Sequence, residues 1–470
     1  MRPEKTSAAI QYFALAFGLF LGFCIWKFGE PVILDTKIFP PVTLSNYWHD
    51  PWPTHWANWL LIPFLVIGVI LGLSNPLRWP ASKWLWLLPL AWLGWQFLSA
   101  THSVDADLTA TALWQFFGCI ACYFLGAFLF ANPRLLNLLL IGILAGFVYC
   151  LIRAIDERFV DFPVSRHVLI EGQQAGWTNL TTESFLELKS ESMIITTNGV
   201  DVANPVWLDK FAKGRVMGTL AYPNCLAGIV LLLLPLFLTL VFRTKNLRPV
   251  IQKMVIALVI ALGAAGLYFS GSKYGWLLAI ALGGLYLLRL DWPLKLKVAA
   301  ITTVVVLGLG IFAARFHHYF ANGATSVGAR FDYWRAALHV TADNPLFGSG
   351  PGTFQRPYAQ IKSPDAEMAR LAHNDYLEQF SDSGICGGII YAAWIFLALT
   401  TIGRRAWKSP DPIAFAIFAG LLAWFVQGFA EFSLYIPGLA WIVFTLLGYM
   451  VVSGNPLDKK PAPAENRRGK

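Results

Sequence analysis

Among the histidines and cationic residues of the sequence, one histidine and three cations are placed where they could take part in a group-transfer reaction. His373 lies in a long polar segment, and a neutral imidazole can take a proton from a hydroxyl group. Arg215 and Lys273 adjoin apolar runs, and Arg330 lies on a predicted helix. Arginine can bind two phosphate oxygens at once, and fixed cations stabilise the charge that develops on a leaving diphosphate. These residues therefore predict a general base and a clamp for an anion.

Each of these residues also has a structural interpretation. A histidine in a loop is usually solvated or structural. Arg215 could lie at the membrane surface with its charge in water. Lys273 stands in a very short turn between apolar segments and needs an anionic partner, either a ligand headgroup or an acid such as Glu431. Arg330 could form a surface ion pair with a neighbouring aspartate.

Four further residues are candidates for orienting sugar or phosphate oxygens. Asn224 and Asn374 offer side-chain amides. Gly348 and Gly350 belong to a glycine-rich turn that could bring backbone amides close to a phosphate or a sugar. No βαβ pattern surrounds these glycines and no P-loop lysine follows them, so the sequence does not predict a nucleotide site.

A metal site has only one weak candidate. Asp105-Ala106-Asp107 is a D-x-D pattern, which could hold a divalent cation together with a diphosphate. The alternative interpretation is a pair of solvated loop acids. We expect no cofactor and no resident metal ion.

The composition indicates a membrane protein with many spans. The 470 residues are 56% hydrophobic and 13% charged, whereas soluble domains have about 25% charged residues. Apolar runs of the length needed to cross a bilayer recur along the whole chain. We predict twelve transmembrane helices, at residues 10–27, 56–74, 83–100, 111–131, 135–153, 216–242, 254–271, 274–289, 298–314, 384–402, 413–430 and 438–453.

The distribution of charge predicts the orientation of these spans. The net charge is +9, but the loops and ends on one side hold 20 of the 36 Lys and Arg residues and only five acids. Loops rich in Lys and Arg stay in the cytoplasm, so we expect both termini to be cytoplasmic. The positive charge then needs no nucleic-acid partner. The basic tail contacts anionic membrane lipids at most.

Two loops on the predicted outer side are long, which favours an enzyme working at that membrane face. Channels and transporters rarely need such loops. The predicted regions are an N-terminal set of five helices (1–153), a periplasmic loop with a small β element (154–215), helices six to nine (216–314), a catalytic periplasmic loop (315–383), helices ten to twelve (384–453) and a basic cytoplasmic tail (454–470).

Local patterns predict structure inside both loops. Alternating segments at 185–188 and 193–197, closed by Asn198-Gly199, predict a β-hairpin. In the second loop, Ser326 is predicted to cap a helix that runs to about Thr341. The apolar face of that helix is predicted to contain Phe331, Trp334 and Leu338.

The order and spacing of short motifs across residues 213–400 resemble the O-antigen ligase and polymerase family of bacterial envelope glycosyltransferases. The matching motifs are Gly218-Thr219…Pro223-Asn224, Ser272-Lys273-x-Gly275, Arg330-x3-Trp334, Pro345-Leu346-x-Gly348-x-Gly350-x-Gly352-x-Phe354, and His373-Asn374-x-Tyr376-Leu377 with Gly384. The first 150 residues match only as a run of spans. Lys273 departs from the pattern, since the family often has Arg there. Lysine keeps the charge but loses the bidentate geometry.

The resemblance implies an all-α, GT-C-like enzyme of the bacterial inner membrane. It implies transfer of an oligosaccharide from undecaprenyl diphosphate to a hydroxyl of lipid A–core, without a metal. His373 matches the family's loop histidine, which acts as the base. Arg215 and Arg330 are the best matches for arginines that bind the diphosphate. Direct attack by a hydroxyl on the anomeric carbon would invert its configuration.

Several alternatives to a ligase stay open. A repeat-unit polymerase joins one lipid-linked repeat to another, and a protein O-oligosaccharyltransferase uses Ser or Thr as the acceptor. A twelve-span secondary transporter is the alternative from another class. Transporters commonly show internal repeats and polar residues at the membrane midplane. The sequence has no such repeat, and its central spans are nearly free of charge.

Overall fold

The computed structural model describes residues 7–73, 82–130 and 132–453. The predicted basic tail, together with Arg2, Lys5 and Arg78, lies outside the described residues. In chain order the elements are α1 (Ala8–Lys27), η1 (Val32–Lys37), α2 (Leu44–His49), α3 (Thr54–Leu73), α4 (Trp84–Ala100), α5 (Ala106–Leu129), α6 (Pro133–Asp156), η2 (Glu157–Asp161), α7 (Phe162–Gln174), α8 (Thr182–Ser190), β1 (Ile194–Thr197), β2 (Val200–Ala203), α9 (Pro205–Lys213), α10 (Pro223–Arg243), α11 (Pro249–Ser270), α12 (Lys273–Arg289), α13 (Leu294–Ala321), α14 (Thr325–Asp343), α15 (Gln355–Ile361), α16 (Asp375–Lys408), α17 (Pro412–Gln427), η3 (Ser433–Tyr435) and α18 (Pro437–Val452).

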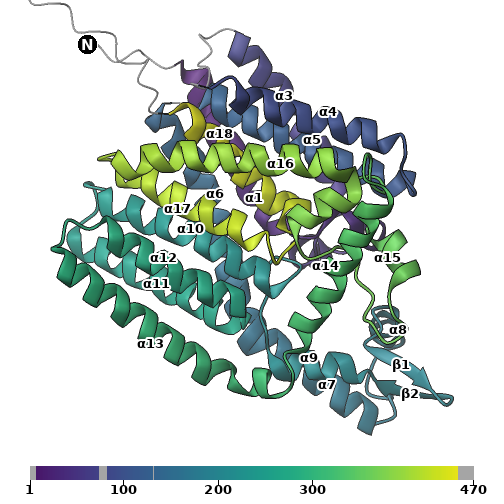
Figure 1. The fold of residues 1–470 in the computed structure, drawn as a ribbon. Coiled ribbons are helices and arrows are strands. Elements are labelled where there is room, and N and C mark those ends of the chain that lie inside the picture. Colours follow the sequence, from purple (N-terminus) through teal and green to yellow (C-terminus); the bar gives the residue numbers. More distant parts are fainter. Residues whose placement is uncertain (1–6, 74–81, 131, 454–470) are drawn as a thin grey trace, which may run out of the picture.

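Every predicted span overlaps a helix among the described residues (Figure 1), but α10 begins at Pro223, seven residues after the predicted start at 216. Among the described residues, eight helices are long and apolar enough to cross a membrane. Helices α17 and α18 are shorter apolar helices of 16 residues. Helices α4 and α12 have 17 residues each and occupy the remaining predicted spans. The chain is an all-α polytopic membrane protein, as its composition predicts.

Helix α18 lies inside the bundle, and all 16 of its residues are buried. It packs mainly against α5 and also against α1. At Gly448 the two backbones approach so closely that a Cβ atom would lie 1.9 Å from the carbonyl oxygen of Tyr123 on α5. Helix α13 is the opposite case, because Phe316 is its one buried residue. An apolar helix with this much exposed surface is stable only when lipid covers it.

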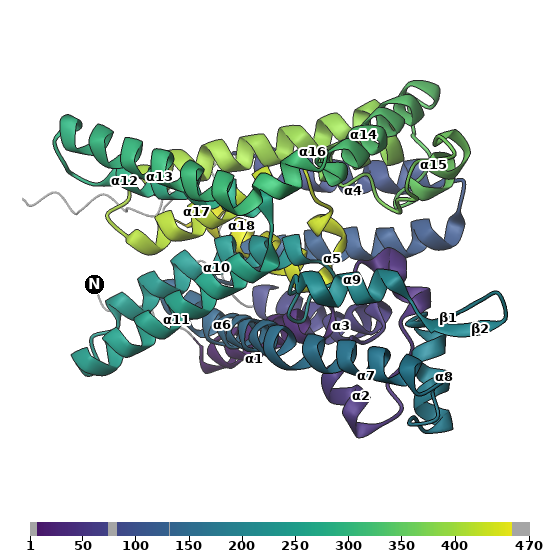
Figure 2. The same ribbon diagram turned by 90° about the horizontal axis from the view of Figure 1, so that it is seen from below.

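The long loops gather at one end of the bundle. Figure 2 shows α8, the β1–β2 hairpin and α15 at that end, on the right of the view. The short connections from α10 to α11 and from α12 to α13 lie at the opposite end. This separation agrees with the predicted alternation of short and long loops. The assignment of the long-loop end to the periplasm stays a prediction.

The first long loop is more helical than predicted. Helices α6 and α7 are continuous through η2, so the predicted boundary at 153 lies inside one long helix. Residues 185–188 belong to α8, so the prediction of a strand there was wrong: Thr181 caps the helix by accepting from the Ser184 amide. The hairpin itself is confirmed as β1 and β2. Asn198 and Gly199 form its turn with φ of +52° and +76°, which matches the twist of the strands.

In the second loop the predicted helix is confirmed as α14, but its cap and its buried face differ. Ala324 stands at the N-cap, and the Ser326 hydroxyl lies 2.6 Å from the Tyr319 hydroxyl instead. Phe331 and Leu338 are 53% and 56% exposed. The buried residues are Tyr333, Ala336, Ala337, Val340 and Thr341. Small residues form this face because Phe354 and Tyr358 pack closely against it.

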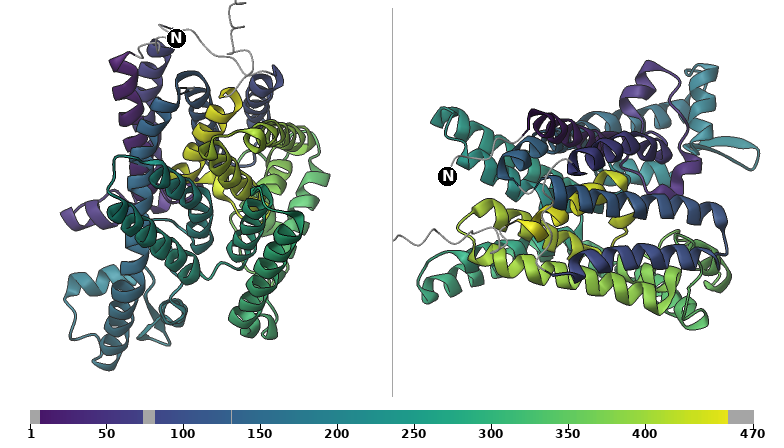
Figure 3. Two further views of the ribbon diagram at one scale, coloured as in Figure 1. Left: turned by 90° about the vertical axis from the view of Figure 1, so that its left-hand side faces the viewer. Right: turned by 90° about the horizontal axis from the view of Figure 1, so that it is seen from above.

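Helix α16 begins at Asp375, nine residues before the predicted span at 384. The predicted boundary marks a kink instead, because Gly384 has φ of +70° and lies where a Cβ atom would be 2.2 Å from the Leu346 carbonyl oxygen. Helix α4 runs beside α16 (Figure 3, right). Trp92 on α4 donates a hydrogen bond to Gln379, just before the kink, at 3.0 Å. The first turns of α16 are therefore fixed from two sides.

Candidate active site

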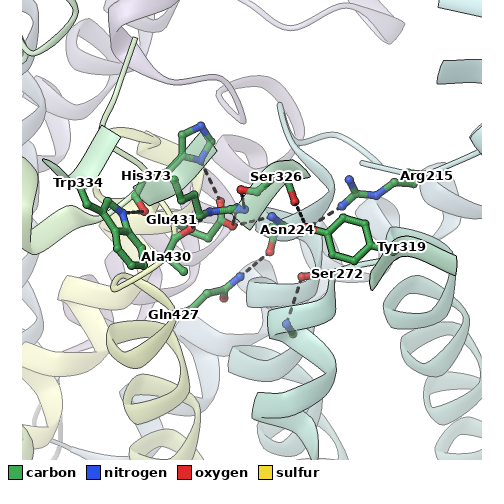
Figure 4. A network of polar contacts seen from close by, with 12 residues as sticks. Arg215, Asn224, Ser272, Tyr319, Ser326, Trp334, His373, Gln427, Ala430 and Glu431 are labelled. Atoms are coloured by element: carbon green, nitrogen blue, oxygen red, sulfur yellow. Dashed lines mark hydrogen bonds and ion pairs between the residues drawn. The ribbon is translucent and has the colours of Figure 1, made fainter. Parts of the chain in front are cut away.

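Glu431 lies at the centre of a polar network at the long-loop end of the bundle (Figure 4). Its side chain is fully buried in the segment that joins α17 to α18. Its Oε1 atom accepts hydrogen bonds from Arg330 Nη2 at 2.8 Å and from Asn224 Nδ2 at 2.6 Å. Arg330 also donates to the carbonyl oxygen of Ala430 at 3.1 Å. One buried carboxylate thus connects α10 and α14.

The other carboxylate oxygen of Glu431 faces His373. The distance from His373 Nδ1 to Glu431 Oε2 is 3.8 Å, and both atoms are buried without a hydrogen-bond partner. A short approach would turn this contact into a hydrogen bond, as happens in many sites when a ligand binds. A carboxylate here favours the tautomer with its proton on Nδ1. Nε2, which points away from Glu431 in Figure 4, is then free to accept a proton.

Local structure fixes the position of His373. Its backbone is left-handed, with φ of +51°, and the next residue, Asn374, caps α16 by accepting from the amides of Tyr376 and Leu377. The Asp375 amide donates to the carbonyl oxygens of Gly428 and Glu431 at 2.7 and 3.1 Å. The start of α16 is therefore tied to the Glu431 segment. The Asn374 side-chain oxygen is engaged in this cap, and the predicted contact of Asn374 with a ligand stays a prediction.

Aromatic rings surround His373. The centroid of its ring lies 4.7 Å from that of Phe432, and the rings of Tyr222 and Tyr333 are each 5.8 Å away. The Trp334 indole donates to the His373 carbonyl oxygen at 3.4 Å. The histidine side chain is 20% exposed. Its imidazole is held in place on three sides and open on one.

Arg215 is joined to the same network through Asn224. Arg215 Nη2 donates to Asn224 Oδ1 at 3.2 Å, and Arg215 Nε donates to the Ser270 carbonyl oxygen at 2.9 Å. Asn224 therefore bridges Arg215 and Glu431, and both ends of its amide are engaged. The structure brings Arg215, Arg330 and His373 together, although 158 positions separate the first from the last. Asn224 joins them as a positioning residue.

Lys273 lies beside this network without a carboxylate partner among the described residues. Its ammonium is 3.8 Å from the centre of the Tyr319 ring and 5.3 Å from that of Phe316, both on α13. The charges of Arg215, Arg330, Arg315 and Lys213 all act on it. Glu431 is the partner of Arg330, so the alternative of a Glu431–Lys273 pair is not found. This concentration of positive charge would favour the binding of an anion.

The glycine-rich turn does not offer free amides to a ligand. Gly348 donates to the Asn344 carbonyl oxygen at 2.9 Å, and Gly350 donates to that of Asp382 at 2.8 Å. A Cβ atom on Gly350 would lie 2.4 Å from Ser103 Oγ. The predicted contact of Gly348 and Gly350 with phosphate or sugar therefore lacks support. The Gly348 amide closes the turn after α14, and the Gly350 amide ties it to α16. The positive φ angles of both residues explain why glycine is needed there.

The D-x-D pattern is part of a helix terminus. Asp105 caps α5 by accepting from the Leu108 amide at 3.1 Å, and it pairs with Arg356 at 2.6 Å. Asp107 lies in the first turn of the same helix, where an acid interacts favourably with the helix dipole. Among the described residues, no group of three or more His, Cys, Asp and Glu side chains is arranged to hold a metal ion.

Two further residues at the site, Glu431 and Arg315, were not predicted as site residues from the sequence. Glu431 was considered only as a partner for Lys273, although a lone acid between two apolar runs is itself a signal of function. Arg315 follows the ninth predicted span, and its guanidinium lies 4.8 Å from the Tyr268 ring centre. A cation at that end also runs against the orientation bias. The expected aspartate pairing applies to Arg335, which contacts Asp332 at 3.3 Å on the surface.

Comparisons with known proteins agree with this part of the chain. Residues 256–392 match the family model of the O-antigen ligases, which confirms the resemblance drawn from the motifs. The matched segment includes Lys273, Arg330 and His373. An uncharacterised protein of Haemophilus influenzae is 28% identical over 170 residues, a match that covers 31% of this chain and 41% of that protein. The match thus spans less than half the length of that relative.

Proposed function

We propose that this chain, whose residues 256–392 carry the O-antigen ligase signature, transfers an oligosaccharide from undecaprenyl diphosphate to a hydroxyl of lipid A–core. The reaction would take place at the periplasmic face of the bacterial inner membrane. The observation that carries the proposal is the His373–Glu431 pair beside a cluster of cations. A base and an anion clamp are the two elements that this transfer requires.

The chemistry follows from the two sides of the site. His373 Nε2 takes the proton of the acceptor hydroxyl as the oxygen attacks the anomeric carbon of the donor sugar. The bond from that carbon to the diphosphate oxygen breaks, and its electron pair leaves with the lipid diphosphate. Attack opposite the leaving group inverts the anomeric configuration. The proton on His373 then passes to the departing diphosphate or to water, which restores the base.

Cations supply the stabilisation that the leaving group needs. Arg330, Arg215 and Lys273 adjoin the His373–Glu431 pair, and Arg315 extends the positive charge along α13. Fixed positive charges of this kind act where negative charge develops in the transition state, commonly the largest contribution to catalysis. Lys273, whose ammonium lies over the Tyr319 ring, provides a compact positive charge, whereas Arg would bind two phosphate oxygens at once.

One assay tests the function and separates it from its nearest rivals. The purified protein in lipid vesicles is given undecaprenyl-diphosphate oligosaccharide, with lipid A–core, a second lipid-linked repeat and a Ser/Thr peptide in parallel. We expect glycosylated lipid A–core. A lengthened lipid-linked chain would identify a polymerase, and a glycosylated peptide would identify a protein glycosyltransferase. Transfer to none of them would refute the proposal.

Replacement of Arg215 by Ala is expected to weaken use of the donor. Charge-assisted hydrogen bonds contribute about 1.5–3 kcal/mol, so KM for the lipid diphosphate should rise about ten- to hundredfold. Lys273→Ala should act in the same direction with a smaller effect. The control is Arg335→Ala on α14, whose side chain is 79% exposed. Unchanged donor kinetics in Arg215→Ala would remove that residue from the clamp.

Transfer is expected to be insensitive to chelation. The charge that a divalent cation would neutralise on the diphosphate is met here by arginine and lysine side chains, and Asp105 is already engaged by Leu108 and Arg356. Rates measured with and without EDTA should agree, and Asp105→Asn, which keeps a good helix cap, should remain active. Loss of activity in EDTA that Mg²⁺ restores would contradict this prediction.

A further inference from the structure

A cavity of about 370 Å³ opens beside His373. Arg330, Tyr333 and His373 form one wall. The segment that follows α1 also lines it, through Glu30 and Leu34. The cavity therefore lies between the N-terminal helices and the proposed catalytic loop. Its volume falls in the range of small-molecule sites, and its aromatic lining with a few polar groups is typical of them.

The backbone that carries Glu30 is held firmly. Gly29 accepts a hydrogen bond from the Ala221 amide at 3.0 Å, and Phe28 accepts one from the Gly438 amide at 3.0 Å. The chain passes so close to the segment that precedes α10 that a Cβ atom on Gly29 would lie 2.2 Å from the Thr219 carbonyl oxygen. Glu30 is thus presented to the cavity from a fixed position.

The Glu30 carboxylate has no hydrogen bond and no ion pair within 4 Å among the described residues, and the residue is partly buried. Burial raises its pKa to about 7, and the charge of Lys210 on α9 partly opposes that rise. Both carboxylate oxygens are therefore available to accept hydrogen bonds from a ligand that lies in the cavity.

The charged residues that line this cavity indicate which of the two substrates it binds. Arg215 and Lys273 do not line it, and Arg330 is the member of the cation cluster that does. Glu30 and Glu367 in its lining offset Arg330 and Arg370, so the cavity offers no net positive charge to a diphosphate. A neutral sugar suits it better, since hydroxyl groups can donate to carboxylates while the ring packs on Tyr222, Tyr333 or Phe432. His373, the proposed base for the acceptor hydroxyl, lines the same cavity.

We propose that this cavity binds the terminal sugar of the acceptor and that Glu30 accepts hydrogen bonds from its hydroxyl groups, as a residue that determines acceptor specificity. The inference rests on the proposed transfer reaction. The donor diphosphate then lies on the Arg215 and Lys273 side of Glu431. Arg330 stands where the two substrates meet.

The test is a comparison of Glu30→Gln with the wild type in vesicles. Lipid A–core is titrated at saturating donor, and a second lipid-linked repeat is titrated in a parallel series. A hydrogen bond to a charged group predicts a rise of about ten- to hundredfold in KM for the acceptor in use. KM for the donor should stay within about twofold. The matched control is Glu191→Gln, because Glu191 also acts on Lys210 but does not line the cavity.

A second variant tests the cavity without changing a charge. Ala329 lies in its lining, so Ala329→Phe should fill part of the volume and raise the acceptor KM while the donor KM is kept. If the wild type is active and both variants keep the wild-type acceptor KM, the inference is overturned while the proposed function stands. A rise in donor KM instead would assign the cavity to the donor and also overturn it. A wild type that transfers to no acceptor would refute the proposed function, and the inference with it.

Discussion

His373→Ala is expected to reduce kcat for transfer about 10²–10⁴-fold, the usual contribution of a positioned general base. The acceptor hydroxyl would have to attack without losing its proton to Nε2. Binding of the donor should change little, because the arginines and Lys273 that would bind the diphosphate have other anchors. The measurement is single-turnover transfer by variant and wild type, with equal amounts of protein confirmed in the membrane.

The control for this variant is His339→Ala. His339 is also a histidine of the second long loop, but its side chain is 59% exposed on α14 and pairs with Asp343 at 3.5 Å. We expect this control to keep wild-type kcat. A His373→Ala protein with full activity would show that another group takes the proton. In that case Glu431 would be the first candidate, since its free oxygen is the nearest carboxylate to the imidazole.

Glu431→Gln is expected to lower kcat about a hundredfold or more while the protein stays folded. The Gln oxygen can still accept from Arg330 and Asn224, but its amide nitrogen would face His373 Nδ1 and donate to it. That contact favours the tautomer with the proton on Nε2, and an imidazole in the wrong tautomer cannot act as the base. The measurement is kcat together with the melting temperature of the purified protein.

A double-mutant cycle separates this role from a structural one. If Glu431 acts through His373, the kcat of the His373→Ala and Glu431→Gln double variant should be close to that of His373→Ala alone. Independent losses that multiply would contradict the link. Glu431→Ala should behave differently, because it also leaves the Arg330 guanidinium and the Asn224 amide without an acceptor. That change should lower the free energy of unfolding by about 1–3 kcal/mol.

The membrane fold could be predicted closely from the sequence, because its cause acts locally. Each span needs about 20 apolar residues in succession, and that requirement can be evaluated one segment at a time. Each of the twelve predicted spans overlaps a helix of the described residues for this reason. The strand assigned to 185–188 failed because a Thr cap and a helical hydrogen-bond pattern outweighed a short alternation. The start of α16 was missed because Gly384 interrupts the helix without ending it.

Part of the site could also be found from the sequence. His373, Arg215, Lys273 and Arg330 were recognised by residue type, by motif order and, for two cations, by a position at the membrane that is costly without a partner. In the structure Arg330 and His373 contact Glu431, Arg215 is joined to it through Asn224, and Lys273 lies beside this network. The roles expected for Gly348 and Gly350 did not follow, because free amides cannot be told from engaged ones until the partner of the turn is known.

The class of the protein and its apolar helices can be predicted from the sequence, and so can the residue types proposed for a base and a cation cluster. The hydrophobicity and the charge of a segment depend on its own residues and not on its neighbours in the fold. Only the tertiary structure decided that Glu431 holds Arg330 and faces His373, that Asn224 links Arg215 to them, and that Glu30 lies in the same cavity as the base. These residues come from segments up to about 400 positions apart. Their meeting depends on how helices pack, and packing is a relation between segments that no single segment contains.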